Sequence, residues 1–336
     1  MLLKKSPAMR LTGAANGAIS YLTMTSGPLV AITGATGFIG RHLLQRLPQH
    51  GCRLRVLLRR STVLPTGCAS AVIGDLARPL NMAAALEGAD AVIHSAGLNP
   101  AMSGLPEEDH RSLNTEATVM LARAAQRAGV KRFIFLSSIA AQSGYHADQV
   151  LTEDLEPHPV ESYGRSKLAA EQGLAQLDLD WVALRLVLVY GPGVKGNIAR
   201  LMQIARSPLP MPLGGLGARR SLLSLDNLTD AINTVLTVPA KLQRPLIVAD
   251  ADALTVADMI AAMRRGLGRP PAIFPVTDLL LKVAFRAAGR EEDFRRLTGT
   301  LVVSTAAFRR LGWAPSISTQ EGLAALMRNS RPGYRA

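Results

Sequence analysis

Short apolar runs alternate with amphipathic segments along most of the chain. Between the runs, apolar residues recur at helical spacing and charged residues lie between them. Strands that alternate with helices are joined by crossover connections, which leave the strands parallel to one another. The pattern therefore predicts an α/β fold with a parallel, doubly wound sheet. The expected strands lie at 29–33, 54–58, 71–73, 91–93, 133–136, 181–189 and 246–248.

The amphipathic segments show where this regular pattern holds and where it ends. Segments 115–128 and 166–177 have clear helical periodicity, and Gly129 is expected to end the first. Beyond Gly193 the pattern is less regular, and the prolines and glycines of 208–217 predict a loop. We expect a disordered extension over 1–27, a dinucleotide-binding domain over 28–190 with a returning strand near 245–249, and a smaller C-terminal substrate lobe over 191–330.

The first apolar run leads directly into three glycines, at positions 34, 37 and 40. The first permits a tight turn, the second lets the backbone approach a pyrophosphate, and the third lets the next helix, expected over 38–47, pack close to the strand. The helix N-terminus then faces the phosphates. This context predicts a Rossmann-type dinucleotide site. Its expected residues are Gly34, Thr36, Gly37, Phe38, Ile39 and Gly40.

The end of the second strand bears on which dinucleotide binds. NAD is usually held there by an acid, whereas the 2′-phosphate of NADP calls for arginine. Here the strand ends in Arg59 and Arg60 with no carboxylate, which favours NADP over NAD as the cofactor. After the third strand, Asp75 and Leu76 are expected near the adenine, and Ala96 follows the fourth strand where the cofactor passes close to the backbone.

Two polar groups on one helix face, with a third at a strand end, suggest proton transfer. Tyr163 and Lys167 are four residues apart, so they share a helix face. An adjacent ammonium is expected to lower the pKa of the phenol, so that it can exchange a proton with a sugar hydroxyl or carbonyl. Ser138 lies at the expected carboxyl end of a strand, where its hydroxyl can bind the same oxygen.

Composition narrows the range of partners. The chain has 336 residues, 48% of them hydrophobic, enough for a large core and about two lobes. Its 38 basic and 25 acidic residues give a net charge of +13, which favours anionic partners. Only 4% of the residues are aromatic, and no basic run is interleaved with stacking side chains. A nucleotide-bearing small molecule is therefore favoured over nucleic acid.

The cysteines, the histidines and the lengths of the apolar runs argue against disulfide-bonded, metal-binding and membrane-spanning proteins. Cys52 and Cys68 lack CxxC spacing and are expected to be thiols of a cytoplasmic protein. The six histidines show no ligand spacing, so no metal is expected. No apolar stretch of about 18 residues predicts an integral membrane span. Segment 279–296 mixes apolar and basic residues, and a lobe helix with a solvated basic edge is favoured over attachment to a membrane surface.

Several ordered motifs resemble the extended short-chain dehydrogenases/reductases, of the NAD-dependent epimerase/dehydratase family. The resemblance spans about 29–327, and it implies Ser138, Tyr163 and Lys167 as the catalytic trio, with Lys167 also holding the nicotinamide ribose. It further implies that Asn197 and Arg220 bind the substrate diphosphate and that the protein can form a homodimer through a four-helix interface. The motifs lie at 33–40, 74–76, 135–138, 163–167, 184–192 and 311–315.

The residues after Ser138 separate the reactions of this family. Dehydratases resemble one another in an Asp-Glu pair there, which supplies an extra acid and base. Here Ile139 and Ala140 follow, so a 4,6-dehydratase is not expected. Segments farther along resemble a bacterial subgroup assigned to polysaccharide biosynthesis, whose members look like UDP-N-acetylhexosamine enzymes. In one of these segments, Arg219 and Arg220 can neutralise a pyrophosphate with two forked guanidiniums.

Three functions follow from these features. A reductase of a UDP-4-keto-N-acetyl-6-deoxyhexosamine is favoured, because reductases release oxidised cofactor and usually accept the phosphorylated one. The close alternative is a 4-epimerase of UDP-glucose or UDP-N-acetylglucosamine, which would keep a tightly held NAD. A non-catalytic dinucleotide-binding protein is disfavoured, because it would not need Ser138, Tyr163 and Lys167.

Overall fold

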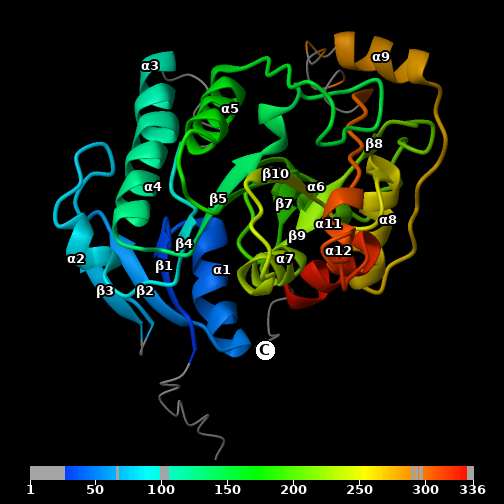
Figure 1. Ribbon diagram of the computed structural model, residues 1–336. Coiled ribbons are helices and arrows are strands. Elements are labelled where there is room, and N and C mark those ends of the chain that lie inside the picture. Colours follow the sequence, from blue (N-terminus) through cyan, green and yellow to red (C-terminus); the bar gives the residue numbers. More distant parts are fainter. Residues whose placement is uncertain are drawn as a thin grey trace, which may run out of the picture.

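The structure of the chain is a computed structural model (Figure 1). It describes residues 27–65, 68–98, 106–287, 289, 291, 294 and 298–330. All but the last residue of the extension expected over 1–27 therefore lies outside the described residues, as does part of segment 279–296.

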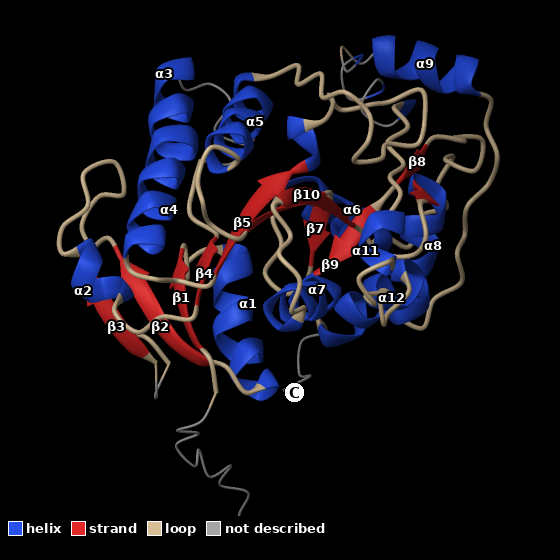
Figure 2. Ribbon diagram, in the orientation of Figure 1, coloured by secondary structure: helices blue, strands red, loops and turns tan. Residues whose placement is uncertain are grey.

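A seven-stranded parallel sheet forms the centre of the larger half (Figure 2). The strand order β10-β6-β5-β4-β1-β2-β3 reverses direction between β1 and β4, as in a doubly wound sheet. The expected α/β fold is thus confirmed. The strands are β1 (Leu29–Thr33), β2 (Arg53–Leu58), β3 (Ala69–Val72), β4 (Ala91–His94), β5 (Arg132–Ser138), β6 (Trp181–Leu186) and β10 (Arg244–Val248).

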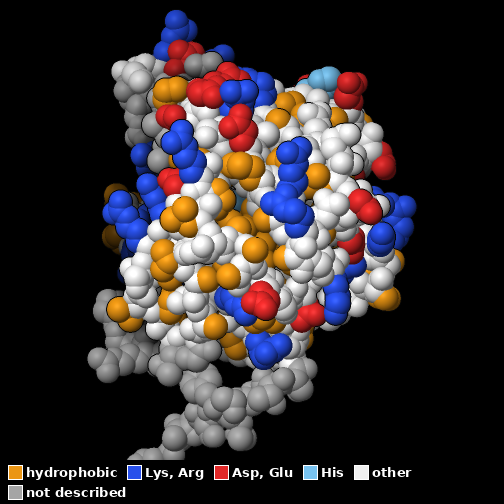
Figure 3. Space-filling model, turned by 60° about the vertical axis from the view of Figure 1, so that its left-hand side comes forward, with side chains coloured by type: hydrophobic (Ala, Val, Ile, Leu, Met, Phe, Trp, Pro, Cys, Tyr) orange, Lys and Arg blue, Asp and Glu red, His pale blue; other side chains and the backbone are white. Residues whose placement is uncertain are grey.

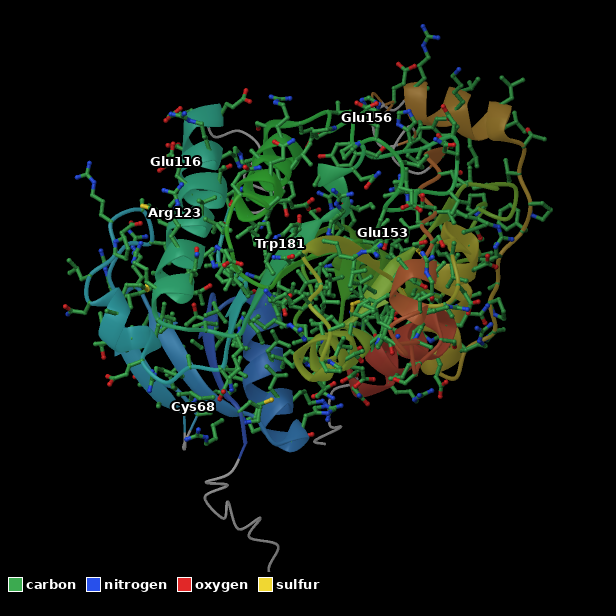
Figure 4. All side chains as sticks on the ribbon, in the orientation of Figure 1. Cys68, Glu116, Arg123, Glu153, Glu156 and Trp181 are labelled. Atoms are coloured by element: carbon green, nitrogen blue, oxygen red, sulfur yellow. The ribbon has the colours of Figure 1, made fainter. Side chains whose placement is uncertain are left out.

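Two apolar layers cover the two faces of this sheet. Along β1, Val30 and Ile32 point into one layer and Ala31 into the other, because successive strand residues face opposite sides. Trp181, at the start of β6, is buried in the second layer (Figure 4). The first layer includes α1 (Phe38–Arg46), η1 (Leu47–His50), α7 (Leu225–Thr237) and α11 (Ala306–Arg309). The second includes α2 (Met82–Leu86), α4 (Ala117–Arg127) and α5 (Ser162–Leu174).

A smaller lobe packs beside β10 and has its own core. Tyr190, Met259 and Leu323 are buried in it, and the main helix contact is between α8 and α12. No Cβ fits at Gly266, since it would lie 2.1 Å from the carbonyl oxygen of Ala324. The lobe contains β7 (Leu188–Tyr190), β8 (Arg219–Arg220), β9 (Leu222–Ser224), β11 (Leu254–Thr255), α6 (Gly196–Arg206), α8 (Val256–Gly266), α9 (Asp278–Ala287) and α12 (Thr319–Asn329).

Some element boundaries differ from those expected. The run 181–189 is not one strand: β6 ends at Leu186, and β7 pairs with β9 in a separate sheet. The helix expected over 166–177 begins at Ser162 and ends at Leu174, and the one expected over 115–128 becomes an α-helix only at Ala117. The turn ahead of Ala117 is a π-helix, η3 (Arg111–Glu116), which joins α3 (Glu107–His110) to α4.

Two features bear on location and redox state. Cys52 and Cys68 are free thiols. Within the described ranges, no helix has both the length and the apolar character needed to cross a bilayer.

Candidate active site

The glycine loop joins β1 to α1 by close backbone contacts. Gly34 has φ +69°, and a Cβ there would lie 2.6 Å from the amide nitrogen of Ala96. A Cβ at Gly40 would lie 2.2 Å from the carbonyl oxygen of Gly34, so a larger residue would push α1 away from the loop. Gly37 is exposed and donates its amide to the Gly34 carbonyl at 2.9 Å. The loop is therefore tight on the protein side and open at Gly37.

A cavity of about 370 Å³ adjoins this loop. Six of the residues expected at the dinucleotide line it, while Gly37, Phe38, Ile39 and Gly40 lie beside it in the loop and the first turn of α1. Its wall includes Gly97, where a Cβ would lie 3.6 Å from Lys167 Nζ, so the lysine lies close to this part of the wall. The donor set and the narrow backbone wall fit a dinucleotide. The six expected residues are Gly34, Thr36, Arg59, Asp75, Leu76 and Ala96.

At the outer end of the cavity, Arg59 has an acidic neighbour. Asp75 Oδ2 lies 3.4 Å from Arg59 Nη2, and both side chains are largely exposed. No carboxylate follows β2 in the sequence, but the β2–β3 pairing brings one across from the end of β3. Arg59 can therefore meet a phosphate only in competition with Asp75, whereas Arg60 is exposed beside it.

The three expected catalytic residues come together at the carboxyl end of β5. Ser138 is half-buried and hydrogen-bonded to Tyr163, and its Oγ also accepts the Ala140 amide at 3.2 Å. Burial raises the pKa of Tyr163 to about 12, and the Ser138 hydrogen bond opposes this only in part. The expected lowering of the phenol pKa is therefore not seen in this structure, because desolvation of the phenolate dominates. Tyr163 holds its proton at neutral pH.

Lys167 lies one helical turn beyond Tyr163 on α5. Its Nζ donates to the Leu136 carbonyl at 3.0 Å, and it lies 4.5 Å from the ring centroid of Phe135 and 5.9 Å from that of Tyr163. Burial lowers the pKa of Lys167 to about 8, while the negative charge of Glu171 raises it. The amine is therefore close to its titration point near neutral pH, unlike an exposed lysine.

Gly164 explains why α5 can approach Ser138 so closely. A Cβ at this position would lie 2.2 Å from the carbonyl oxygen of Ala140, in the turn η4 (Ile139–Ala141) that Ser138 caps. Sequence reasoning passed over Gly164, although a glycine directly after the expected tyrosine was a readable sign of close packing.

A buried hydrogen-bond chain connects the glycine loop to the catalytic region. Thr33 Oγ1 and His94 Nδ1 are 2.7 Å apart, and His94 Nε2 and Thr118 Oγ1 are 3.0 Å apart. Thr118 donates to the Asn114 carbonyl at 2.6 Å, so it must accept from Nε2–H, which leaves Nδ1 to accept from Thr33. Burial lowers the pKa of His94 to about 3, so the ring is neutral.

Asn114, which sequence reasoning missed, lies at the end of this chain. It is in the π-helix η3, and its side chain accepts the Leu98 amide at 2.8 Å and donates to Ser166 Oγ at 3.1 Å. A Cβ at Gly97 would lie 2.7 Å from its Oδ1. A π-turn in a helix frequently marks a functional position. Asn114 therefore ties the cavity wall to the helix that carries Tyr163.

An ion pair beneath the site fixes α5 to the sheet. Glu171 accepts from Ser137 Oγ at 2.5 Å and pairs with Arg185 at 2.6 Å, and both partners of the ion pair are nearly fully buried. Arg185 also donates to Gln142. Removing either charge would leave the other buried and unpaired, so this pair holds the catalytic helix in place.

The expected substrate residues of the lobe are less closely grouped. Asn197 is exposed in the first turn of α6. Arg219 and Arg220 are consecutive in β8, so their side chains point to opposite faces. Arg219 is exposed and donates to the Ala253 carbonyl at 3.1 Å, whereas Arg220 is partly buried, and its burial lowers its pKa. The geometry does not support a paired fork, and Arg220 is the candidate that remains.

Several known proteins are similar to this chain in sequence or structure. UDP-glucose 4-epimerase of Vibrio cholerae is 32% identical over 304 residues, covering 87% of this chain and 92% of that protein. Ceramide reductase of Caulobacter vibrioides is 35% identical over 202 residues, 59% of this chain and 58% of that protein. The solved structure of MoeE5 in complex with UDP-glucose and NAD is 27% identical, with a TM-score of 0.67 over 89% of this chain and 97% of that one.

A protein-family model covers the region that holds most of these residues. The model of the NAD dependent epimerase/dehydratase family matches residues 30–265, which include the glycine loop, Ser138, Tyr163 and Lys167. The chain is an enzyme of the NAD-dependent epimerase/dehydratase family, with the extended short-chain dehydrogenase/reductase fold.

Proposed function

We propose that the enzyme reduces the 4-keto group of a UDP-N-acetyl-6-deoxyhexosamine for bacterial surface polysaccharide synthesis. The observation that supports this proposal most is Tyr163, which is buried, protonated at neutral pH and hydrogen-bonded to Ser138. It lies on the same helix as Lys167, whose Nζ is close to Gly97 in the wall of the cavity that fits a dinucleotide. A proton held on the phenol suits donation to a carbonyl oxygen better than abstraction from a hydroxyl.

The residues of the chain divide the work of this reduction. A reduced dinucleotide held in the cavity would supply a hydride to C4. Ser138 donates a hydrogen bond to the carbonyl oxygen and polarises it, and Tyr163 transfers its proton to that oxygen as negative charge develops. Lys167, charged below about pH 8, stabilises the phenolate left behind and holds the nicotinamide ribose.

The proposed cofactor preference is for NADP over NAD, by a small margin. Arg59 and Arg60 offer positive charge where the 2′-phosphate would lie, but Asp75 already pairs with Arg59. The solved structure of MoeE5 contains NAD, which fits a weak preference. Arg59→Ala should lower kcat/KM with NADPH by about tenfold and leave NADH nearly unchanged, because only the phosphorylated ribose carries the extra charge.

The substrate test combines a panel of sugars with both cofactors. The enzyme is incubated with UDP-hexoses, UDP-N-acetylhexosamines and their 4-keto-6-deoxy derivatives, and the absorbance of NADH and NADPH is followed separately. We expect loss of one reduced cofactor for each 4-keto sugar consumed. Absence of turnover with every keto sugar would refute the reductase proposal. Because one relative is named a ceramide reductase, a ceramide is included as a comparison substrate.

A 4-epimerase is the second candidate, favoured by the 32% identity to UDP-glucose 4-epimerase over most of both chains. Its signature would be interconversion of C4 epimers without net change in cofactor absorbance. If enzyme with dinucleotide already bound epimerises UDP-glucose or UDP-N-acetylglucosamine, the protein is a 4-epimerase and not a reductase.

The proposal includes a cytoplasmic homodimer. The free thiols of Cys52 and Cys68 suit a reducing compartment. Helices α4 and α5 lie on the outside of the second layer, and apolar side chains gather between charged ones on the side of the molecule that carries α2, α3 and α4 (Figure 3). Light scattering after gel filtration should give twice the mass of one 35.7 kDa chain.

A further inference from the structure

We propose that α9 docks on an anionic lipid surface, the alternative that the sequence pattern of 279–296 disfavoured; the exposed apolar side chains of the helix are the reason for the change. The helix carries three pairs of residues spaced four apart, each on its own stripe. Leu281 and Phe285 form the inner stripe, Leu279 and Val283 the outer one, and Lys282 and Arg286 lie between them. This arrangement goes beyond the redox reaction and does not depend on it.

The inner stripe fixes α9 to the lobe. Leu281 is buried in a small cluster with Leu216 and Phe294, and the ring of Phe285 lies 5.8 Å from that of Phe294. The helix therefore has its contacts with the protein already satisfied on this side, and its outer stripe is left for another partner.

The outer stripe is both apolar and exposed. Leu279 and Val283 are 70% and 57% exposed, and Leu280 beside them is 63% exposed. So many exposed apolar side chains are unusual on one short helix. The segment leading into α9 adds Phe274, and the loop paired with it through Met211 and Ile273 adds Leu209; both side chains are exposed. Apolar side chains of this size lower their free energy by entering the headgroup boundary of a membrane.

Charge selects the kind of surface. Lys282 and Arg286 are exposed along one edge of the apolar stripe, where they would meet lipid headgroups as the leucines enter. The whole chain carries a net charge of +13, which adds long-range attraction to an anionic bilayer. A second copy of the chain would bring the same basic residues against each other, so it is the poorer occupant.

The position of α9 leaves the redox site open. The helix lies at the outer corner of the small lobe, across the molecule from α2 and β3 (Figure 1). The dinucleotide cavity is lined from the ends of β2 and β3, so it stays accessible when α9 rests on a membrane.

The test is vesicle flotation with the full chain. Vesicles of phosphatidylcholine alone are compared with vesicles that also contain phosphatidylglycerol, at low and high salt. We expect flotation with the anionic vesicles and weakening by salt. Leu279→Ser/Leu280→Ser/Val283→Ser should lower the partition coefficient roughly tenfold or more. Lys282→Gln/Arg286→Gln should lower it about fivefold for each charge removed.

Controls separate docking from unfolding and from self-association. Val63→Ser/Val150→Ser removes exposed apolar side chains elsewhere and should float like the parent protein. All variants should keep dinucleotide binding and thermal midpoint. The proposal is overturned if the parent protein fails to float with anionic vesicles, if it floats equally with neutral ones, or if the triple variant floats unchanged. It is also overturned if the triple variant instead converts a dimer to a monomer.

Discussion

The sheet half and the small lobe hold their candidate functional groups in different ways. In the sheet half, Gly34 and Ser138 lie at carboxyl ends of parallel strands, and Tyr163 and Lys167 lie on a helix locked against one of them. In the lobe, Arg220 lies on a two-residue strand and Asn197 on the exposed first turn of a helix.

The difference concerns what sets the position of each group. Backbone contacts with no room for a Cβ fix the sheet half, as at Gly40 and Gly164. In the lobe loop the restraint is uneven: a Cβ at Gly215 would lie 2.1 Å from the Val276 carbonyl oxygen, whereas a Cβ at Gly217 would meet nothing within 4 Å. We therefore expect a substitution beside the candidate catalytic groups of the sheet half to be tolerated less well than one at the open position 217 of the lobe loop.

The largest expected effect on kcat comes from removing the phenol proton of Tyr163 in the sheet half. Tyr163→Phe keeps the buried ring but deletes the acid, so kcat should fall about 10³-fold while the dissociation constant of the dinucleotide stays within about twofold. Stopped-flow turnover and fluorescence titration measure the two quantities. Tyr145→Phe, on an exposed tyrosine, is the control and should keep full activity. Unchanged turnover in Tyr163→Phe would end the proposed mechanism.

Adding one methyl group at two glycines tests the contrast in rigidity. Gly164→Ala forces α5 away from Ala140, and the resulting shift of Tyr163 should lower kcat about 10²-fold. Gly217→Ala should have no effect on kcat, because its Cβ enters open space. Equal rates for both variants in the same turnover assay would show that the close contact at position 164 does not set the position of Tyr163.

At the junction between the halves, Asp250 should make the free energy of unfolding depend on pH. Tyr190 of the lobe donates to Asp250 at 2.8 Å, next to the end of β10, and burial raises the pKa of Asp250 to about 6. Because this folded-state pKa lies above the unfolded one, the contribution to stability is present below about pH 4 and is lost as pH rises through about 6. The loss should be on the order of 2–3 kcal/mol.

Urea unfolding at several pH values between about 4 and 7 measures this contribution. In Asp250→Asn, the fall in the free energy of unfolding over that interval should disappear. A variant with the same pH slope as the parent protein would mean that Asp250 titrates at its ordinary value.

The smallest expected effect separates the two arginines of β8. If Arg220 binds the diphosphate, Arg220→Gln should raise KM for the nucleotide sugar about tenfold, because a charge-assisted hydrogen bond would be lost. Arg219→Gln should change KM less than twofold, roughly, since its side chain points to the opposite face. Steady-state kinetics with varied sugar concentration measures both KM values. Equal increases in KM would support diphosphate binding by both arginines together.

The sequence predicts the sheet half well because its signals are local. Apolar runs identify six of the strands in the main sheet in nearly the right places, and three glycines locate the loop. Tyr163 and Lys167 are brought together by helix periodicity alone. These features depend on residues within one or two turns of each other.

Other features depend on contacts between distant segments. The run 181–189 divides into two strands because β7 finds its partner in β9. Asp75 reaches Arg59 only through the register of β2 and β3. In the π-helix, the Asn114 side chain hydrogen-bonds to a backbone amide 16 residues earlier and to a serine 52 residues later. No pattern within a short window carries such information.

The chain of hydrogen bonds through His94 also limits where pH can act. Its ends are an amide of Ala96, which can only donate, and the carbonyl of Asn114, which can only accept. The hydrogens between them consequently have a single arrangement, with no alternative in which every bond runs the other way. With the imidazole neutral down to about pH 3, this link stays unchanged across the whole working range. Any ionisation seen in the rate must then arise outside this link.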